Sequence, residues 1–299
     1  MVNRRKKQPN YKRYRIFSKI GVAIIGIVSA FVFANDFSPF SGQQPATDTV
    51  EYTAPVTTKS GTQPKHLDMA TAADALSPKS PVIGKRLRNI GYTSYFSEEY
   101  GIPVWVSYVT CFPFKYDSSE RPDKFIQDFR VRSPEHTDYS RSGYDRGHMA
   151  PNYAISRTYG AKAQMETFYT TNIAPQVPKL NRKQWMQLEQ YIANDLATQY
   201  GQVLVYVGPV ISGDMKTIRG KIAIPKAFWM VVMVRDSDGN AHVAGFLIPQ
   251  VPNKRSFKDY AMTVDQVEEA TGLDFFPILN QATQQKLESA IDRRVFLLN

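Results

Sequence analysis

Cysteine is almost absent from this chain of 299 residues, in which Cys111 is the only one. An intrachain disulfide is therefore excluded, and so is a zinc site built from several cysteines. A domain of this size can rely on its hydrophobic core without covalent cross-links. Because Cys111 lies in an apolar, strand-like segment, we interpret it as a small buried hydrophobic residue and not as a nucleophile.

The net charge is +10, but most of the chain has little excess of basic residues. Residues 1–19 contain eight Lys and Arg and no acidic residue, which leaves a net charge of +2 for the rest of the chain. The basic balance therefore belongs to the N-terminal segment and does not indicate a phosphate-binding surface. With 42% hydrophobic and 21% charged residues, the composition excludes global disorder and a multi-span membrane protein.

A short apolar run follows the basic segment, over residues 20–34. As a helix it would span about 22 Å, against roughly 30 Å for the hydrocarbon core of a bilayer. That length fits the core of a signal peptide, with residues 32–34 before a cleavage site. The long basic leader and the flanking aromatic residues favour an uncleaved transmembrane anchor instead. Under both readings residues 1–19 stay cytoplasmic and the remainder is exported, either anchored to the membrane or secreted or periplasmic.

The rest of the chain divides into a flexible linker over residues 35–80, rich in Pro, Thr, Ser and Gln, and a globular domain over 81–299. In the domain, 202–210 is apolar on both faces, which predicts a central strand covered on each side. Strands and helices occur without a regular alternation, so the fold class is α+β, with a mainly antiparallel sheet covered by helices. The other predicted strands are 103–112, 221–224, 228–234 and 242–248, and the predicted helices are 181–200, 263–272 and 281–293.

Two segments combine residue types that fit phosphodiester chemistry. The first contains Asp145, Arg146, Gly147 and His148 in succession. An imidazole can accept a proton near neutral pH, and a guanidinium two residues away can bind phosphate oxygens. The alternative to a catalytic site is a surface loop in which Asp145 and Arg146 form an ion pair and have no catalytic role. For an isolated histidine this alternative would be preferred.

The second segment runs from Asn172-Ile-Ala-Pro-Gln176 into a helix that carries Asn181, Trp185 and Glu189 at intervals of four. This spacing places the three side chains roughly on one helix face. Trp185 is interpreted as a core residue that anchors the helix. The carboxamide of Asn181 suits Mg²⁺, which prefers oxygen ligands and retains most of its water. Glu189 lies about 12 Å further along the axis, so it could reach a metal-bound water or orient another side chain.

These segments resemble the DNA/RNA non-specific endonucleases of the ββα-metal, or His-Me finger, superfamily, the group that includes mitochondrial endonuclease G. The resemblance covers roughly residues 90–290 and involves several blocks in the same order, including Asp145 to His148 and Asn172 to Gln176. It implies a finger in which a β-hairpin carries His148 and packs on the helix that begins near Asn181.

The resemblance also implies roles. His148 would deprotonate the attacking water, Arg146 would steady the scissile phosphate, and Asp145 would shape the substrate-binding loop. Asn181 would be the direct protein ligand of Mg²⁺, with Mn²⁺ as a substitute, and Glu189 would hold the metal's water shell. The substrates would be DNA and RNA, cut to products with 5′-phosphates. Protein partners are not indicated.

The chain departs from the family pattern at Ala193, where some relatives have a phosphate-binding arginine, and at Met230, where many have a lysine. The departure keeps three alternatives open: a catalytically silent, membrane-tethered nucleic-acid-binding protein, a phosphodiesterase for a small or lipid substrate, and a structural envelope protein. His136 and His242 lack a motif context and are interpreted as structural or solvated. The candidates to replace the arginine are Arg130, Arg132, Arg157 and Arg182.

Overall fold

The computed structural model describes residues 69–251 and 254–298. The basic segment 1–19, the apolar run 20–34 and most of the predicted linker lie outside these residues. Among the helices that the structure describes, none combines the length and the apolar character that crossing a membrane requires.

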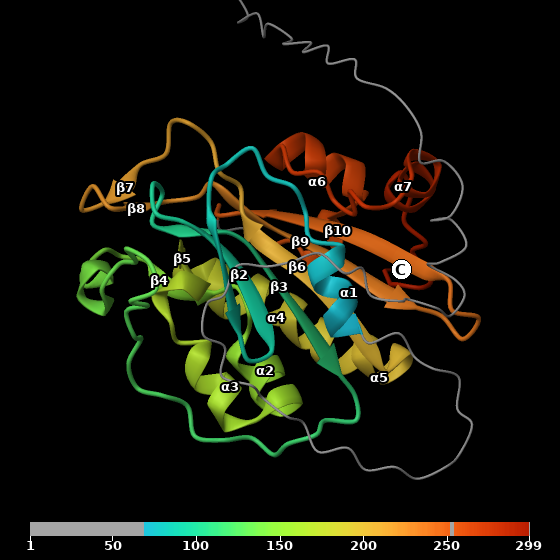
Figure 1. Cartoon of the computed structure of the whole chain (residues 1–299), viewed down its shortest axis with the longest axis horizontal. Coiled ribbons are helices and arrows are strands. Elements are labelled where there is room, and N and C mark those ends of the chain that lie inside the picture. Colours follow the sequence, from blue (N-terminus) through green and yellow to red (C-terminus); the bar gives the residue numbers. More distant parts are fainter. Residues whose placement is uncertain (1–68, 252–253, 299) are drawn as a thin grey trace, which may run out of the picture.

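One antiparallel sheet of seven strands forms the centre of the molecule, in the order β1-β2-β3-β6-β9-β10-β11 (Figure 1). The predicted α+β fold with a mainly antiparallel sheet is confirmed. Two smaller hairpins, β4–β5 and β7–β8, stand outside this sheet. The bounds are β1 Lys85–Asn89, β2 Tyr92–Ser97, β3 Ile102–Cys111, β4 Asp145–His148, β5 Ile173–Gln176, β6 Gln202–Pro209, β7 Thr217–Ile218, β8 Ile222–Ala223, β9 Ala227–Arg235, β10 Ala241–Pro249 and β11 Ala261–Met262.

The strand predicted to be central, β6, lies between β3 and β9 and is buried at every position after Gln202. Its side chains alternate between two cores, as the period of two requires. Val205 packs in the cluster that contains Leu188 and Ile192, whereas Tyr206 packs in the cluster that contains Val264. The apolar pattern on both faces of this strand therefore reflects helical cover on both sides of the sheet.

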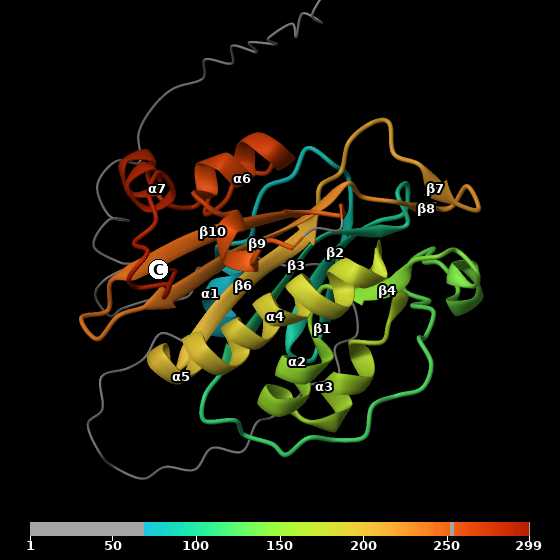
Figure 2. The same cartoon turned by 180° about the vertical axis from the view of Figure 1, so that it is seen from behind.

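Helices cover the two faces unequally (Figures 1 and 2). On one face lie α2 (Asn152–Tyr159), α3 (Ala161–Glu166) and a helix that runs without a break over residues 180–200. We call this last element the site helix. Its four parts are η3 (Leu180–Trp185), α4 (Met186–Gln190), η4 (Tyr191–Leu196) and α5 (Ala197–Tyr200), of which η3 and η4 have π-helical hydrogen bonding. The opposite face carries α1 (Met69–Ala75), α6 (Val264–Thr271) and α7 (Gln281–Glu288).

Three predicted boundaries differ from the structure. Residues 69–80, predicted as the end of the linker, belong to the folded part, because Met69 and Ala73 are buried against the sheet. The predicted strand 221–224 is only the two-residue strand β8. The predicted helix 281–293 ends at Glu288, and the chain then turns so that Phe296 and Leu298 enter the core.

Candidate active site

A β-hairpin carries the first predicted motif. Strand β4 pairs with β5 in a register that places Asp145 opposite Gln176 and His148 opposite Ile173. The segment after the hairpin is fixed by Asn172, whose Oδ1 accepts from the amide of Ala150 at 2.8 Å and whose Nδ2 donates to the Ala150 carbonyl at 2.9 Å. The asparagine of the second motif block thus holds the chain that follows His148 in place.

The hairpin requires a glycine at residue 147 because the side chain of Gln176 lies against the backbone at this position. A Cβ atom at this position would overlap the carboxamide of Gln176, which is fully buried. The backbone of Gly147 does not adopt a positive φ. The hairpin therefore needs glycine here because Gln176 lies over the strand, and not because the backbone is left-handed.

His148 is held in an aromatic environment on β4. Its ring centroid lies 5.2 Å from that of Phe125 and 5.0 Å from that of Phe168. The Nε2 atom is buried and has no hydrogen-bond partner. Burial, reinforced by the nearby positive charge of Arg121, lowers the pKa of His148 to about 3. The imidazole is therefore neutral at pH 7, with a ring nitrogen that can accept a proton.

Asp145 connects the hairpin to the site helix. It accepts a hydrogen bond from Asn181 Nδ2 at 2.9 Å, and its two oxygens accept from Arg182 at 2.7 and 2.8 Å. Burial would raise the pKa of Asp145, but the bonds from Arg182 and Asn181 hold it below its usual value. This contact fixes the Asn181 amide nitrogen, while Oδ1 makes no hydrogen bond to any described residue.

Arg146 does not form the ion pair with Asp145 that a non-catalytic surface loop would contain. Its Nη2 donates to the carbonyl of His136 at 2.8 Å, and its guanidinium lies 5.5 Å from the ring centroid of Tyr139 and 5.7 Å from that of Phe125. The Nε atom is buried without a partner. Arg146 and His148 therefore share Phe125, which places the guanidinium and the imidazole beside each other.

Glu189 lies on the site helix, eight residues beyond Asn181, and does not contact the other predicted site residues directly. Burial raises its pKa to about 8, against an opposing contribution from Trp185. The charge of Glu189 in turn helps to raise the pKa of Tyr108 on β3. At neutral pH the free protein therefore holds Glu189 mainly in the protonated form, and a nearby cation would favour its ionisation.

Ala193 and Met230 stand at the two positions where the chain departs from the family pattern. Ala193 is buried in the core, as is Met230. Of the four arginines considered from the sequence, only Arg182 contacts a predicted site residue. Arg130 bonds to Asp128, Arg157 lies over Phe114, and Arg132 is exposed without an ion pair in the described part of the chain.

Sequence analysis missed Arg121, which lies 5.4 Å from the ring centroid of Phe168 and whose charge acts on His148. It also missed His136, which stacks on Phe125 at 6.2 Å and binds Arg146 through its carbonyl. Neither residue lies in a motif, and only the fold brings the loop 121–136 to the hairpin. His242 is structural, as interpreted, and pairs with Asp236 at 2.9 Å.

The donors of the site suit a hard divalent cation. Asn181 offers a carboxamide oxygen whose nitrogen is already fixed by Asp145. Carboxamide and carboxylate oxygens with several waters are the ligands that Mg²⁺ prefers.

A hairpin that carries a histidine, packed on a helix that carries an asparagine, defines a ββα-metal fold. A family model described as DNA/RNA non-specific endonuclease matches residues 71–282. The chain belongs to this family.

Individual relatives agree with this assignment. The chain is 36% identical to a nuclease of Nostoc sp. over 182 residues, which cover 58% of this chain and 64% of that protein. It is 31% identical to human mitochondrial endonuclease G over 191 residues, or 58% of this chain and 63% of the relative. The matched region thus spans just under two thirds of both relatives. A crystal structure of the EndoG/EndoGI complex superposes with a TM-score of 0.62 at 27% identity, covering 70% of this chain and 93% of that one.

Proposed function

We propose that this protein is an Mg²⁺-dependent endonuclease that hydrolyses DNA and RNA with little sequence preference and leaves 5′-phosphates. The observation that carries the proposal is the unpartnered Nε2 of a neutral His148, next to Arg146 and Arg121 and on the same finger as Asn181. Membership of the endonuclease family supports the reaction class.

In the proposed reaction His148 accepts a proton from water as the water oxygen attacks phosphorus. The bond from phosphorus to the 3′ oxygen breaks, and the leaving oxygen takes a proton from a second water. The phosphate of the substrate raises the proton affinity of the imidazole, which counters the depressed pKa of His148 in the free protein.

Asn181 and, through water, Glu189 would hold the metal, which supplies positive charge for the phosphate and the leaving oxygen. Asp145 orients the Asn181 carboxamide through the 2.9 Å hydrogen bond. Arg146 and Arg121 would bind the phosphate, with Arg182 available at the rim. Contacts of this kind position the backbone of a nucleic acid and read no bases, which accounts for low sequence preference.

The test is plasmid nicking by the full chain, with Mg²⁺ and with EDTA. Replacing the base by His148→Ala should reduce the rate at least 100-fold, because general-base catalysis contributes that much. His242→Ala is the matched control, since it removes an imidazole that pairs with Asp236 on another part of the sheet. A His148→Ala variant that nicks at the wild-type rate would exclude this base. DNA binding without cleavage by the wild-type chain would instead identify a silent binder.

We also propose that residues 1–34 export the protein and keep it at the membrane, with residues 35–68 as a tether. The basic leader, the apolar run and the linker composition support this arrangement. Protease added to cells whose outer envelope has been opened, but whose cytoplasmic membrane is intact, should then degrade the domain. Protection of the domain until the membrane is opened would contradict export, and a mature chain that begins near residue 35 would identify a cleaved signal.

A further inference from the structure

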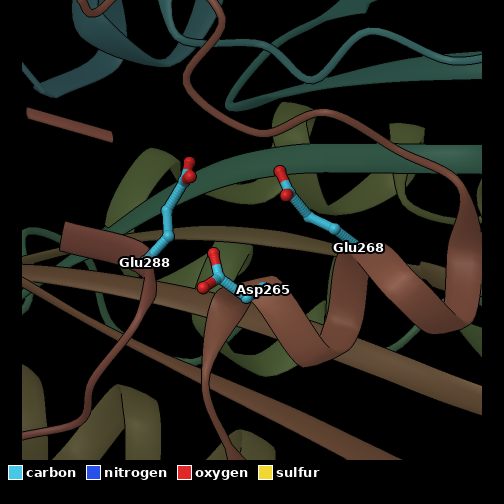
Figure 3. A group of neighbouring side chains, drawn as sticks. All are labelled: Asp265, Glu268 and Glu288. Atoms are coloured by element: carbon cyan, nitrogen blue, oxygen red, sulfur yellow. The ribbon is translucent and has the colours of Figure 1, made fainter. Parts of the chain in front are cut away.

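Three carboxylates converge on the face of the sheet opposite the finger. Asp265 and Glu268 lie one turn apart on α6, and Glu288 is the last residue of α7. One oxygen from each lies within 4.8 Å of the others. Figure 3 shows the three carboxyl groups around one space between the two helices. None of the described ion pairs involves any of them.

Glu288 is the unusual member of this group. Its side chain is buried, with the residue only 5% exposed, and its Oε1 has no hydrogen-bond partner. A carboxylate at the C-terminal end of a helix also faces the negative end of the helix dipole. Burying such a carboxyl group without a partner costs free energy, and no described ion pair supplies a counter-charge for it.

The surrounding structure fixes the position of the other two carboxylates. The capping box of Thr263 and Gln266 sets the first turn of α6, which contains Asp265. Glu268 accepts the amide of Phe275 on Oε1 at 2.6 Å, so its second oxygen is left for another partner. Gln284 on α7 donates to the carbonyl of Phe275 at 2.9 Å, so both helices are tied to the same loop.

We propose that Asp265, Glu268 and Glu288 bind a calcium ion that links α6 to α7. A Ca²⁺ ion at about 2.4 Å from each ligand can contact oxygens separated by up to about twice that distance, as these are. Ca²⁺ tolerates irregular sets of carboxylate ligands, whereas Mg²⁺ requires near-ideal octahedral geometry at about 2.1 Å and usually keeps several waters, so three carboxylates from two helices favour calcium.

The electrostatics of the cluster agree with the geometry. Burial, together with the negative charges of Glu268, Asp265 and Asp274, raises the pKa of Glu288 to about 8. A dication removes the repulsion among the three carboxylates and supplies the missing partner of Glu288. The site would stabilise the C-terminal helices and is built from residues that the finger does not use, so it is independent of catalysis.

Thermal unfolding of the full chain in EDTA, CaCl₂ or MgCl₂ tests this site. The experiment is run on the Asn181→Ala variant, so that the finger contributes no metal binding. With a few carboxylates and an exposed Asp265, we expect a dissociation constant of about 0.1–1 mM. At ten times that concentration Ca²⁺ should raise Tm by about 3–5 °C, and Mg²⁺ should raise it less.

Two further substitutions in that background locate the effect. Glu288→Gln and Asp265→Asn should each abolish most of the Ca²⁺ shift, whereas Glu269→Gln, on the exposed side of α6, should retain it. In EDTA, Glu288→Gln should unfold at or above the temperature of its parent, because it removes an uncompensated acid. An undiminished shift in Glu288→Gln, or no shift in the parent up to 10 mM Ca²⁺, overturns the proposal. An equal shift with Mg²⁺ overturns the choice of calcium.

Discussion

At the scale of single residues, the proposed active site contains two titratable groups, and burial lowers the pKa of one and raises the pKa of the other. His148 has its pKa lowered to about 3, and Glu189 has its pKa raised to about 8. Burial disfavours the charged form of each group. Without metal and substrate, both side chains are therefore neutral at pH 7, and the site is prepared to gain charge when a cation and a phosphate enter together.

Because buried Glu189 is protonated in the metal-free protein, the stability of the protein in EDTA should depend on pH. The folded pKa of Glu189 lies above the unfolded value, so its contribution to stability is complete below about pH 4.5 and is lost as the pH rises through about 8. Between pH 6 and 9 this one group should lower the free energy of unfolding by about 3 kcal/mol. Urea titrations of the wild-type chain and of Glu189→Gln measure the difference, because the glutamine cannot ionise.

The control for this experiment is Glu269→Gln, which replaces an exposed acid on α6. It should leave the pH dependence of unfolding as it is in the wild-type chain. Mg²⁺ should reduce the loss of stability at high pH in the wild-type chain if Glu189 holds the water shell of the metal. A Glu189→Gln variant that keeps the full wild-type dependence on pH would show that Glu189 ionises freely in the folded state.

At the scale of secondary-structure elements, the sequence predicted those elements whose pattern is determined by burial alone. The strand β6 and the site helix were found because their apolar residues repeat with periods that both cores require. The hairpin that carries His148 was found through the family resemblance, since its four-residue strands are too short for a periodic pattern. The segment 121–136 has no regular element before η1 (His136–Tyr139), so nothing in its pattern predicted Arg121 or Phe125 beside His148.

The connection between hairpin and site helix leads to a prediction about metal activation. Asp145→Ala removes both the anchor of Asn181 and the partner of Arg182, whereas Arg182→Ala leaves the hydrogen bond between Asp145 and Asn181 intact. The Mg²⁺ concentration for half-maximal nicking should therefore rise about tenfold or more in Asp145→Ala and change much less in Arg182→Ala.

Stability measurements separate this effect from unfolding. The side chain of Arg182 is 69% exposed, so its ion pair with Asp145 should contribute no more than about 1 kcal/mol to the free energy of unfolding. Equal shifts in the Mg²⁺ requirement for the two variants would mean that the ion pair, and not the orientation of Asn181, determines metal binding.

At the scale of the whole molecule, the sheet separates the proposed active site from the proposed calcium site. The finger and the site helix lie on one face, and α1, α6 and α7 lie on the other (Figures 1 and 2). Both faces meet in the strands β3, β6 and β9, whose residues contribute to both cores. The second face therefore affects the active site through the stability of the sheet, while its side chains remain distant from the reacting groups.

This division predicts where the chain can be shortened. The sequence placed the domain boundary at residue 81 because residues 69–80 contain no long apolar period. Those twelve residues nevertheless make specific contacts: Met69 and Ala73 are buried, the hydroxyl of Tyr206 donates to the Ala73 carbonyl at 2.9 Å, and Lys79 exchanges backbone hydrogen bonds with Asp274.

A chain that begins at Met69 should keep the stability of the full domain, whereas one that begins at residue 81 exposes apolar surface of the sheet. We expect the shorter chain to lose about 2–4 kcal/mol in the free energy of unfolding, while its nicking rate per folded molecule, at a temperature where it is folded, stays near that of the longer chain. Urea unfolding and nicking assays on both chains measure the two quantities, and equal unfolding midpoints would mean that α1 contributes nothing to the stability of the sheet it covers.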